Sequence, residues 1–363
     1  MDETPLDPRV KKRALEIVRG IPEKAKDERA RAAYKHVLEH VEDGPETDGR
    51  RVLFGRVGSR KSAFEHLMRQ LGIPIELALV KNKLAMPPLG KMSEVEQYDD
   101  MALRIETEHG PRWLTVRDKF APYGYVPAEM RGQPAIRLVT GTPADVVTNT
   151  GALDGIVFEG RADLHEDGSA TVELAQSFTG KVGITMRNVF DKIPETQVRE
   201  FVETRLLARN LPGARLRDVK IDNKQELGEP LIVRTHADVP QLARPQGKGL
   251  VLRALFPMRI AQLAALPSRQ TPLLLGSSSH AEVRFTIVVP ESMRMPASLS
   301  VPPVKDGERV VLVRDTVQGH AVTLDRVIDI PAVRVLPGAE YAKFQAFAQA
   351  ADAAVERDVM LGL

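Results

Sequence analysis

The sequence of 363 residues contains no cysteine at all. This absence excludes disulfide bonds, thiolate metal sites and thiol catalysis, and it leaves the cellular compartment open. Aromatic side chains are also scarce, at 5% of residues. Because single strands of nucleic acid bind by stacking their bases on aromatic rings, this scarcity disfavours such a partner.

The chain also lacks an excess of either charge. It has 51 basic and 49 acidic residues, mixed along its length, for a formal net charge of +2. No basic face is evident, so a nucleic-acid partner is not expected. No apolar run approaches the roughly 18 residues of a membrane helix, so no transmembrane segment is expected. The first eight residues, Met-Asp-Glu-Thr-Pro-Leu-Asp-Pro, do not resemble a secretory signal.

What the chain does contain is typical of globular proteins. Hydrophobic residues make up 43% of it and charged residues 28%, and the length allows two or three domains with buried cores. The apolar spacing predicts helices over 8–19 and 27–41, and a third from Ser59 to Leu71. Ser59 is a suitable N-cap for that third helix, and Gly72 a suitable left-handed residue after its end.

Strand patterns follow these helices. Alternation predicts strands over 75–80 and 101–105, then a turn at His109-Gly110 before a strand over 113–116. Beyond about residue 150 the pattern becomes predominantly β. A hairpin is predicted over 156–164 and 171–178, and the further strands and helices are predicted at 195–210 (helix), 215–221, 230–236, 282–289, 309–314, 320–330 (strands) and 338–358 (helix). The sequence therefore predicts an α+β protein with a domain over 1–150 and a β-rich domain over 151–363 that ends in an amphipathic helix.

Four segments of the first domain carry a resemblance to a known family. They are the turn Val57–Phe64 before the third helix, the strand starts Tyr98–Ile105 and Trp113–Val116, and the continuation Phe120–Gly132. Their order resembles the transglutaminase-like fold, the cysteine-protease-like family of bacterial transglutaminase homologues. The β-rich part resembles the domain that follows this unit in many homologues.

The resemblance assigns three positions to the family's catalytic residues. A Gly-Asp-Cys-Lys-type turn aligns Arg60 with the nucleophilic cysteine, a Phe-Asn-His-type strand aligns Asp100 with the histidine, and a Trp-Leu-Asp-type strand aligns Thr115 with the aspartate. A guanidinium stays charged and cannot act as a nucleophile. The resemblance therefore implies a degenerate, non-catalytic member in which Arg60, Asp100 and Thr115 are vestigial and no cofactor or metal is needed.

A hypothesis about these positions follows from charge. If Arg60 and Asp100 occupy the places of the cysteine and histidine, they should form an ion pair of reversed sign, within about 4 Å of each other. Exchanging both charges together would avoid leaving one of them buried without a partner.

The function expected from these observations is that of a pseudo-transglutaminase serving as a protein-interaction scaffold or complex subunit, with protein partners. The resemblance also implies a periplasmic or cell-surface location, since the relatives are mostly exported.

Two other functions remain open. One is an enzyme, a hydrolase or acyltransferase, with a rearranged active site; Ser62 and His66 are four apart on one helix face. The other is a peptide- or carbohydrate-binding module in the β-rich part.

His36 and His40 are also four apart, but their polar neighbours favour a solvated helix face over a metal site.

Overall fold

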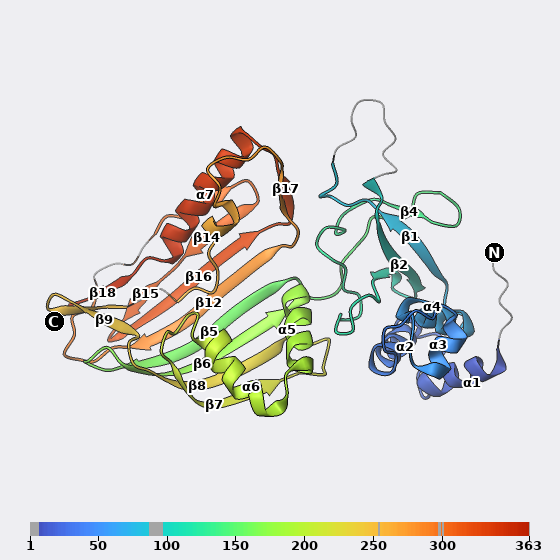
Figure 1. The fold of residues 1–363 in the computed structure, drawn as a ribbon, viewed down its shortest axis with the longest axis horizontal. Helices are drawn as coiled ribbons and strands as arrows, with labels where there is room; N and C mark the ends of the chain where they lie inside the picture. Colours follow the sequence, from blue (N-terminus) through green and yellow to red (C-terminus); the bar gives the residue numbers. More distant parts are fainter. Residues whose placement is uncertain (1–6, 87–96, 253–254, 297–298, 300, 363) are drawn as a thin grey trace. The chain divides into compact units, whose positions relative to one another are not determined.

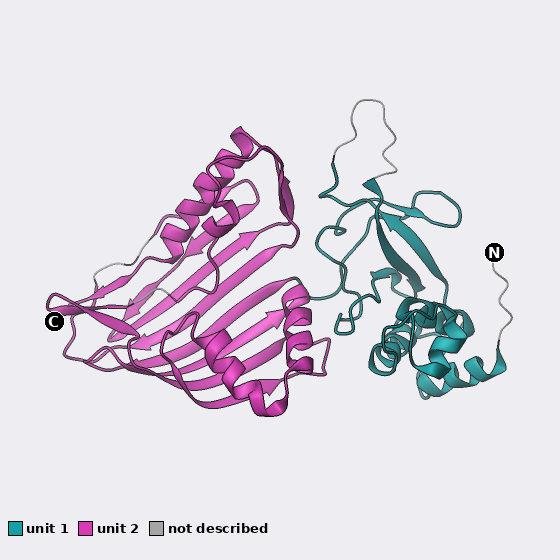
Figure 2. Cartoon of the chain, in the orientation of Figure 1, with its two compact units in different colours: residues 1–153 teal, residues 154–363 magenta. Residues whose placement is uncertain are grey.

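The computed structural model describes residues 7–86, 97–252, 255–296, 299 and 301–362. The chain divides into two compact units, 1–153 and 154–363 (Figure 2). The expected boundary was at residue 150, and the division falls after Leu153. The predicted α+β class is confirmed: the first unit combines helices with an antiparallel sheet, and the second is rich in strands.

The helices of the first unit come before its sheet. They are α1 (Pro8–Ile17), α2 (Lys26–His40), α3 (Gly49–Gly55) and α4 (Arg60–Gln70). Ser59 caps α4 as predicted, since its Oγ accepts from the backbone N–H of Ser62 at 3.3 Å. Gly72 follows α4 with φ of +68°, a left-handed conformation that suits glycine.

Helix α3 was not predicted, because its seven residues bury only Val52. Tertiary packing secures it against α4. A Cβ on Gly49 would lie 2.4 Å from the Ser62 carbonyl oxygen, so this helix contact requires a residue without a side chain.

The sheet of the first unit has the strand order β3-β2-β1-β4, and all its pairs are antiparallel. Its strands are β1 (Ile75–Val80), β2 (Asp100–Thr107), β3 (Gly110–Leu114) and β4 (Ala135–Arg137). One face buries a small cluster in which Ala102 and Trp113 contact Val126 and Met130 of the following segment. Helices α2 and α4 contact strands β2 and β1.

The second unit is built on a broad sheet of nine strands (Figure 1). Its order is β13-β14-β16-β12-β5-β6-β8-β7, with β15 pairing on β16. The strands are β5 (Gly155–Leu164), β6 (Ala170–Thr179), β7 (Arg215–Asp222), β8 (Leu231–Val239), β12 (Ser279–Val288), β13 (Val304–Asp306), β14 (Arg309–Val313), β15 (Thr316–Gln318) and β16 (Ala321–Ile330). Within this sheet, β5 and β12 pair in parallel, and the other described pairs are antiparallel.

Helices and smaller sheets complete this unit. They are α5 (Gly180–Lys192), α6 (Glu195–Phe201), the π-helix η2 (Val202–Leu207), the 3₁₀ helix η3 (Ala261–Ala264) and α7 (Ala339–Val355). The small strands are β9 (Ala243–Gln246), β10 (Gly249–Leu252) and β18 (Val359–Leu361) in one sheet, and β11 (Leu273–Leu275) with β17 (Val333–Val335) in another. Helix α5 contacts β5, β6 and β8, whereas α7 contacts β13 and β14 (Figure 1).

The predicted helix over 195–210 needs correction. It is an α-helix only to Phe201, continues as a π-helix, and ends at Leu207. Helix α5 was not predicted either. Its start at Gly180 depends on tertiary structure: Asp154 Oδ1 accepts from the Lys181 backbone N–H at 2.7 Å.

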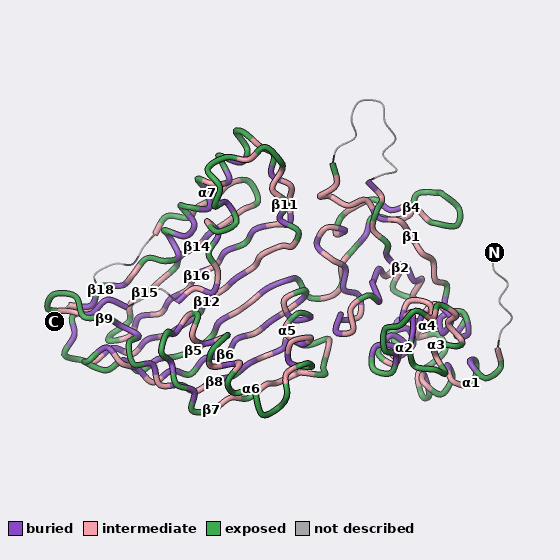
Figure 3. The backbone as a smooth tube through the Cα atoms, viewed as in Figure 1, coloured by how far each residue is buried: buried purple, intermediate pink, exposed green. Residues whose placement is uncertain are grey.

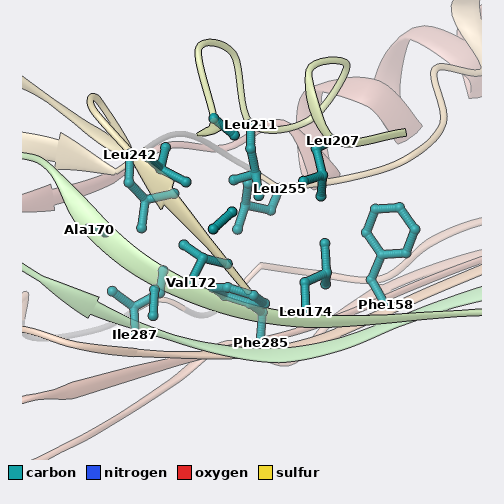
Figure 4. Packing of buried hydrophobic residues seen from close by; sticks show 14 of the residues in the cluster. Phe158, Ala170, Val172, Leu174, Leu207, Leu211, Leu242, Leu255, Phe285 and Ile287 are labelled. Carbon is teal, nitrogen blue, oxygen red and sulfur yellow. The ribbon is translucent and has the colours of Figure 1, made fainter. Parts of the chain in front are cut away.

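The large sheet has one buried face and one polar face. Successive side chains of a strand point to opposite faces, so the alternation of apolar and polar residues separates the two. On the buried face, Phe158, Leu174 and Phe285 pack with Leu211 and Leu255 (Figure 4). Along each strand, buried residues alternate with more exposed ones (Figure 3). The alternate positions form the polar face described below. In the described ranges, no helix is long and apolar enough to cross a membrane.

Candidate functional site

Arg60 occupies the first turn of α4, the position aligned with the family's nucleophile. Its side chain is 3% exposed. Its Nε donates to the Val41 carbonyl oxygen at 2.8 Å, and its Nη1 donates to Asp43 Oδ2 at 2.8 Å. Val41 is the C-cap of α2, where the helix carbonyls carry partial negative charge. Arg60 therefore ties the end of α2 to the start of α4.

Asp100 is the first residue of β2 and pairs with Val80. It shares a face with Ala102, which is buried beneath the segment containing Val126 and Met130. Its Oδ2 is buried with no hydrogen-bond partner in the described part of the chain. Burial, together with the charges of Asp99 and Glu129, raises the pKa of this carboxyl above its usual value.

The expected ion pair between Arg60 and Asp100 is therefore wrong. Arg60 pairs with Asp43, on the connection that follows α2. Strand parity places Asp100 on the sheet face shared with Ala102, whereas the Arg60 side chain extends toward the end of α2. The order of motifs along the sequence, on which the ion pair was predicted, does not show where the side chains of Arg60 and Asp100 point.

Thr115, the position aligned with the family's aspartate, makes its hydrogen bond through the backbone and not through the side chain. Its carbonyl oxygen lies 3.0 Å from the hydroxyl of Tyr34, which can also donate to the Ala121 carbonyl at 3.1 Å. The Thr115 hydroxyl is buried without a partner among the described residues. Tyr34 is buried against the ring of Phe64, with ring centroids 5.8 Å apart, and this burial raises the pKa of its phenol. The three aligned side chains are not assembled into one polar site.

The serine and histidine of α4 also fail to form a catalytic pair. Ser62 Oγ donates to Ser59 Oγ at 3.1 Å, within the N-cap of the helix. His66 is buried, and its Nε2 has no partner in the described residues. Burial and the charge of Arg50 lower the pKa of His66. A serine nucleophile needs a base within hydrogen-bond reach, and His66 does not supply one to Ser62.

His36 and His40 stack, with ring centroids 4.3 Å apart. Burial and the adjacent His40 lower the pKa of His36 to about 4. The His40 Nδ1 lies 3.0 Å from the His36 carbonyl oxygen, so that nitrogen has a backbone partner. Across the described ranges, no group of three or more histidine, aspartate or glutamate side chains is placed to hold a metal ion.

The polar face of the large sheet carries a hollow that no sequence pattern indicated. Its volume is about 500 Å³. Strand register aligns Arg161, Glu173, His236 and Asp218 in one row across β5, β6, β8 and β7. The alternating polar positions indicated an exposed face, but only the register shows that His236 lies between two carboxylates.

Comparisons with known proteins bear on the fold. No protein-family model matches this chain, and no curated protein matches it in sequence. A crystal structure of a putative protease from Parabacteroides distasonis is similar, with a TM-score of 0.55 and 13% sequence identity. The match covers 98% of this chain and 55% of that chain, so this chain spans about half of its length. At this identity the similarity shows a shared fold alone.

Proposed function

We propose that this chain is a non-catalytic protein with a transglutaminase-like first unit, and that it acts as an interaction scaffold or a complex subunit. The observation that carries the proposal is the state of Arg60. At the position aligned with the nucleophile, its guanidinium is buried and bonded to Val41 and Asp43. A fold can persist when its chemistry is lost, since function resides in the site.

The chemistry supports the same proposal. Covalent acyl transfer needs a nucleophile and a base within about 3.2 Å, together with donors for the developing oxyanion. Asp100 lies on a sheet face covered by another segment, and Thr115 is engaged through its carbonyl. Neither side chain bonds to Arg60, whose partners are Val41 and Asp43, so position 60 has no acid–base partner of the family's kind.

One observation favours the alternative of an enzyme with a rearranged site. In the hollow of the polar sheet face, His236 is flanked in register by Glu173 and Asp218. Imidazole and carboxylate groups in one pocket are the usual participants in general acid–base catalysis. For a carbohydrate-binding module, a stacking platform would be expected. The described lining of this hollow includes no phenylalanine, tyrosine or tryptophan.

An activity assay on the full chain tests the proposal. The purified protein would be incubated with a fluorescent primary amine and a glutamine-containing protein, and separately with a peptide library. We expect no product above the buffer rate, while a thiol transglutaminase run in parallel gives amine incorporation. Turnover that persists on purification and is lost in His236→Ala or Ser62→Ala would contradict the proposal. His280→Ala is a matched control, because it removes an imidazole from the same sheet face outside the hollow.

The scaffold role has its own test. Affinity purification of the tagged chain from its native host, followed by mass spectrometry, should recover a protein partner in a stoichiometric amount. Reconstitution from purified components should then give a complex of defined mass. A chain that stays free in the native host and in reconstitution would count against a scaffold.

A further inference from the structure

A pocket of about 480 Å³ lies in the second unit, where four distant segments meet. Residues 209–212 follow η2, Arg244 belongs to β9, 256–262 lead into η3, and 356–358 follow α7. Its volume falls within the range of roughly 300–1,000 Å³ found for small-molecule sites. None of the residues considered for catalysis contributes to it.

One wall of this pocket is held by a buried carboxylate. Asp352 of α7 is 9% exposed. Its Oδ1 accepts from the Ile260 N–H at 2.7 Å, and its Oδ2 accepts from the Ala261 N–H at 2.9 Å. These bonds cap the start of η3 and fix the segment that presents Arg259 to the pocket.

A second part of the lining, at 356–358, is held by a buried ion pair. Arg326 of β16 is fully buried and pairs with Asp315, with 2.6 Å between Nη2 and Oδ2. Arg326 also donates to the Val355 carbonyl oxygen and, at 3.1 Å, to that of Arg357. The backbone is therefore fixed on both sides of Glu356. A site whose walls are fixed before binding loses less entropy when a ligand enters.

The charges of the pocket are unequal. Arg244 pairs with Asp358 at 3.1 Å, and Arg259 pairs with Glu356 at 2.5 Å. The side chain of Arg209 forms no ion pair or hydrogen bond with any described residue. Three guanidinium groups thus face two carboxylates, and one positive charge is uncompensated.

The pocket surface is mainly polar, and its smaller apolar part is formed by Phe256, Met258, Pro212 and Pro257. Phe256 packs against both hydrophobic clusters of this unit, so its ring is fixed in place. The two prolines limit backbone movement at the rim. A ligand that fits this surface has an apolar body beside its charged group.

We infer that this pocket binds a small organic anion, a carboxylate attached to an apolar body. The carboxylate is bonded by the free guanidinium of Arg209, whose planar donors match its two oxygens. The apolar body rests on Phe256 and Met258. A free organic acid and the C-terminus of a peptide ending in an apolar residue share this chemistry. This site is independent of the proposed scaffold role, and either can fail without the other.

The test compares an acid with its uncharged analogue on the full chain. N-acetylphenylalanine, its amide, and an acetylated tetrapeptide ending in phenylalanine with a free carboxylate would be titrated by calorimetry. We expect the acid to bind with a dissociation constant near 1 mM or lower, and the amide at least about tenfold more weakly. A tetrapeptide that binds more tightly than the acid assigns the site to a peptide C-terminus, and one that binds more weakly assigns it to a free acid.

Arginine variants locate the binding. Arg209→Ala should weaken binding of the acid about tenfold. Arg205→Ala removes the same charge from an exposed position in η2 outside the pocket and should leave binding unchanged. Both arginines are exposed, so both variants should keep the wild-type melting temperature. Equal binding of acid and amide, equal losses in the two variants, or no binding of the acid up to about 10 mM would overturn the inference.

Discussion

At the scale of single residues, buried arginines connect distant parts of each unit. Arg60 joins α2 to α4, and Arg326 joins β16 to the end of α7. Arg104 of β2 reaches Glu76 at 2.9 Å and also bonds Asp145, 41 residues further along the chain. Arg187 donates to the carbonyl oxygens at Asn223, Glu226 and Glu229. In a chain without cysteine, such contacts add to strand pairing and apolar packing as non-covalent links between segments distant in sequence.

A pH dependence follows from Asp100. Its pKa is raised in the folded state, so between the unfolded value of about 3.9 and the folded value the native state binds more protons. The free energy of unfolding therefore falls as pH rises through this window. Asp100→Asn removes this loss and should increase stability at pH 7, with little change at pH 3.

Urea denaturation of both proteins at the two pH values measures the effect. Asp99→Asn should give a smaller gain of the same sign, because it removes only the neighbouring charge. A loss of stability in Asp100→Asn at pH 7 would contradict the argument.

At the scale of elements, cross-strand contacts determine which residues a strand can accept. Gly160 lies in the middle of β5, where a side chain would usually be favoured. A Cβ at this position would lie 2.3 Å from the Glu173 carbonyl oxygen and 2.7 Å from the Phe285 ring. The close approach of β5 to its neighbours therefore requires glycine here.

Gly160→Ala should consequently destabilise the second unit. We expect a loss of about 1–3 kcal/mol, the usual cost of adding a methyl group where no space exists. Gly228→Ala is the matched control, since no atom lies within 4 Å of a Cβ there, and it should be neutral or slightly stabilising. Chemical denaturation of the two variants measures both changes. If Gly160→Ala were as stable as Gly228→Ala, the sheet would accommodate the added methyl group at no cost in folding free energy, contrary to this prediction.

At the scale of the whole molecule, each unit has its own core. The cluster around Trp113 belongs to the first unit, and the clusters around Phe285 and Phe344 belong to the second. Separate cores allow separate unfolding, as is usual for domains.

Differential scanning calorimetry of the full chain can test this independence. Arg60→Met should destabilise the first unit by about 2 kcal/mol, since it removes a charged donor from the Val41 carbonyl. Arg326→Met should destabilise the second unit by about 3–5 kcal/mol, since it leaves the buried Asp315 carboxylate without its cation. We expect two transitions, each lowered by one substitution only, with additive effects in the double variant. A single transition lowered equally by both would contradict independent cores.

The sequence alone determined the chemistry that this protein cannot perform and most of its regular structure. Absent cysteine excludes a thiol nucleophile at any position. Period-two alternation located the strands now seen as β1, β5, β6 and β16, and the N-cap and glycine signals placed α4, because these are local properties of the backbone. Helix α3, with seven residues, is too short to show a helical period. Helix α5 does carry an apolar face, but Gly180 and Gly183 in its first turn weaken the local signal for a helix.

Only the tertiary structure decided which side chains meet. The partner of Arg60 is Asp43 and not Asp100, because helix position and strand parity set the direction of each side chain. The pocket beside α7 brings together residues 209–212 and 356–358, and no local pattern links segments so far apart. Register and long-range packing depend on the whole folded chain, since they are fixed only when distant apolar faces are buried together.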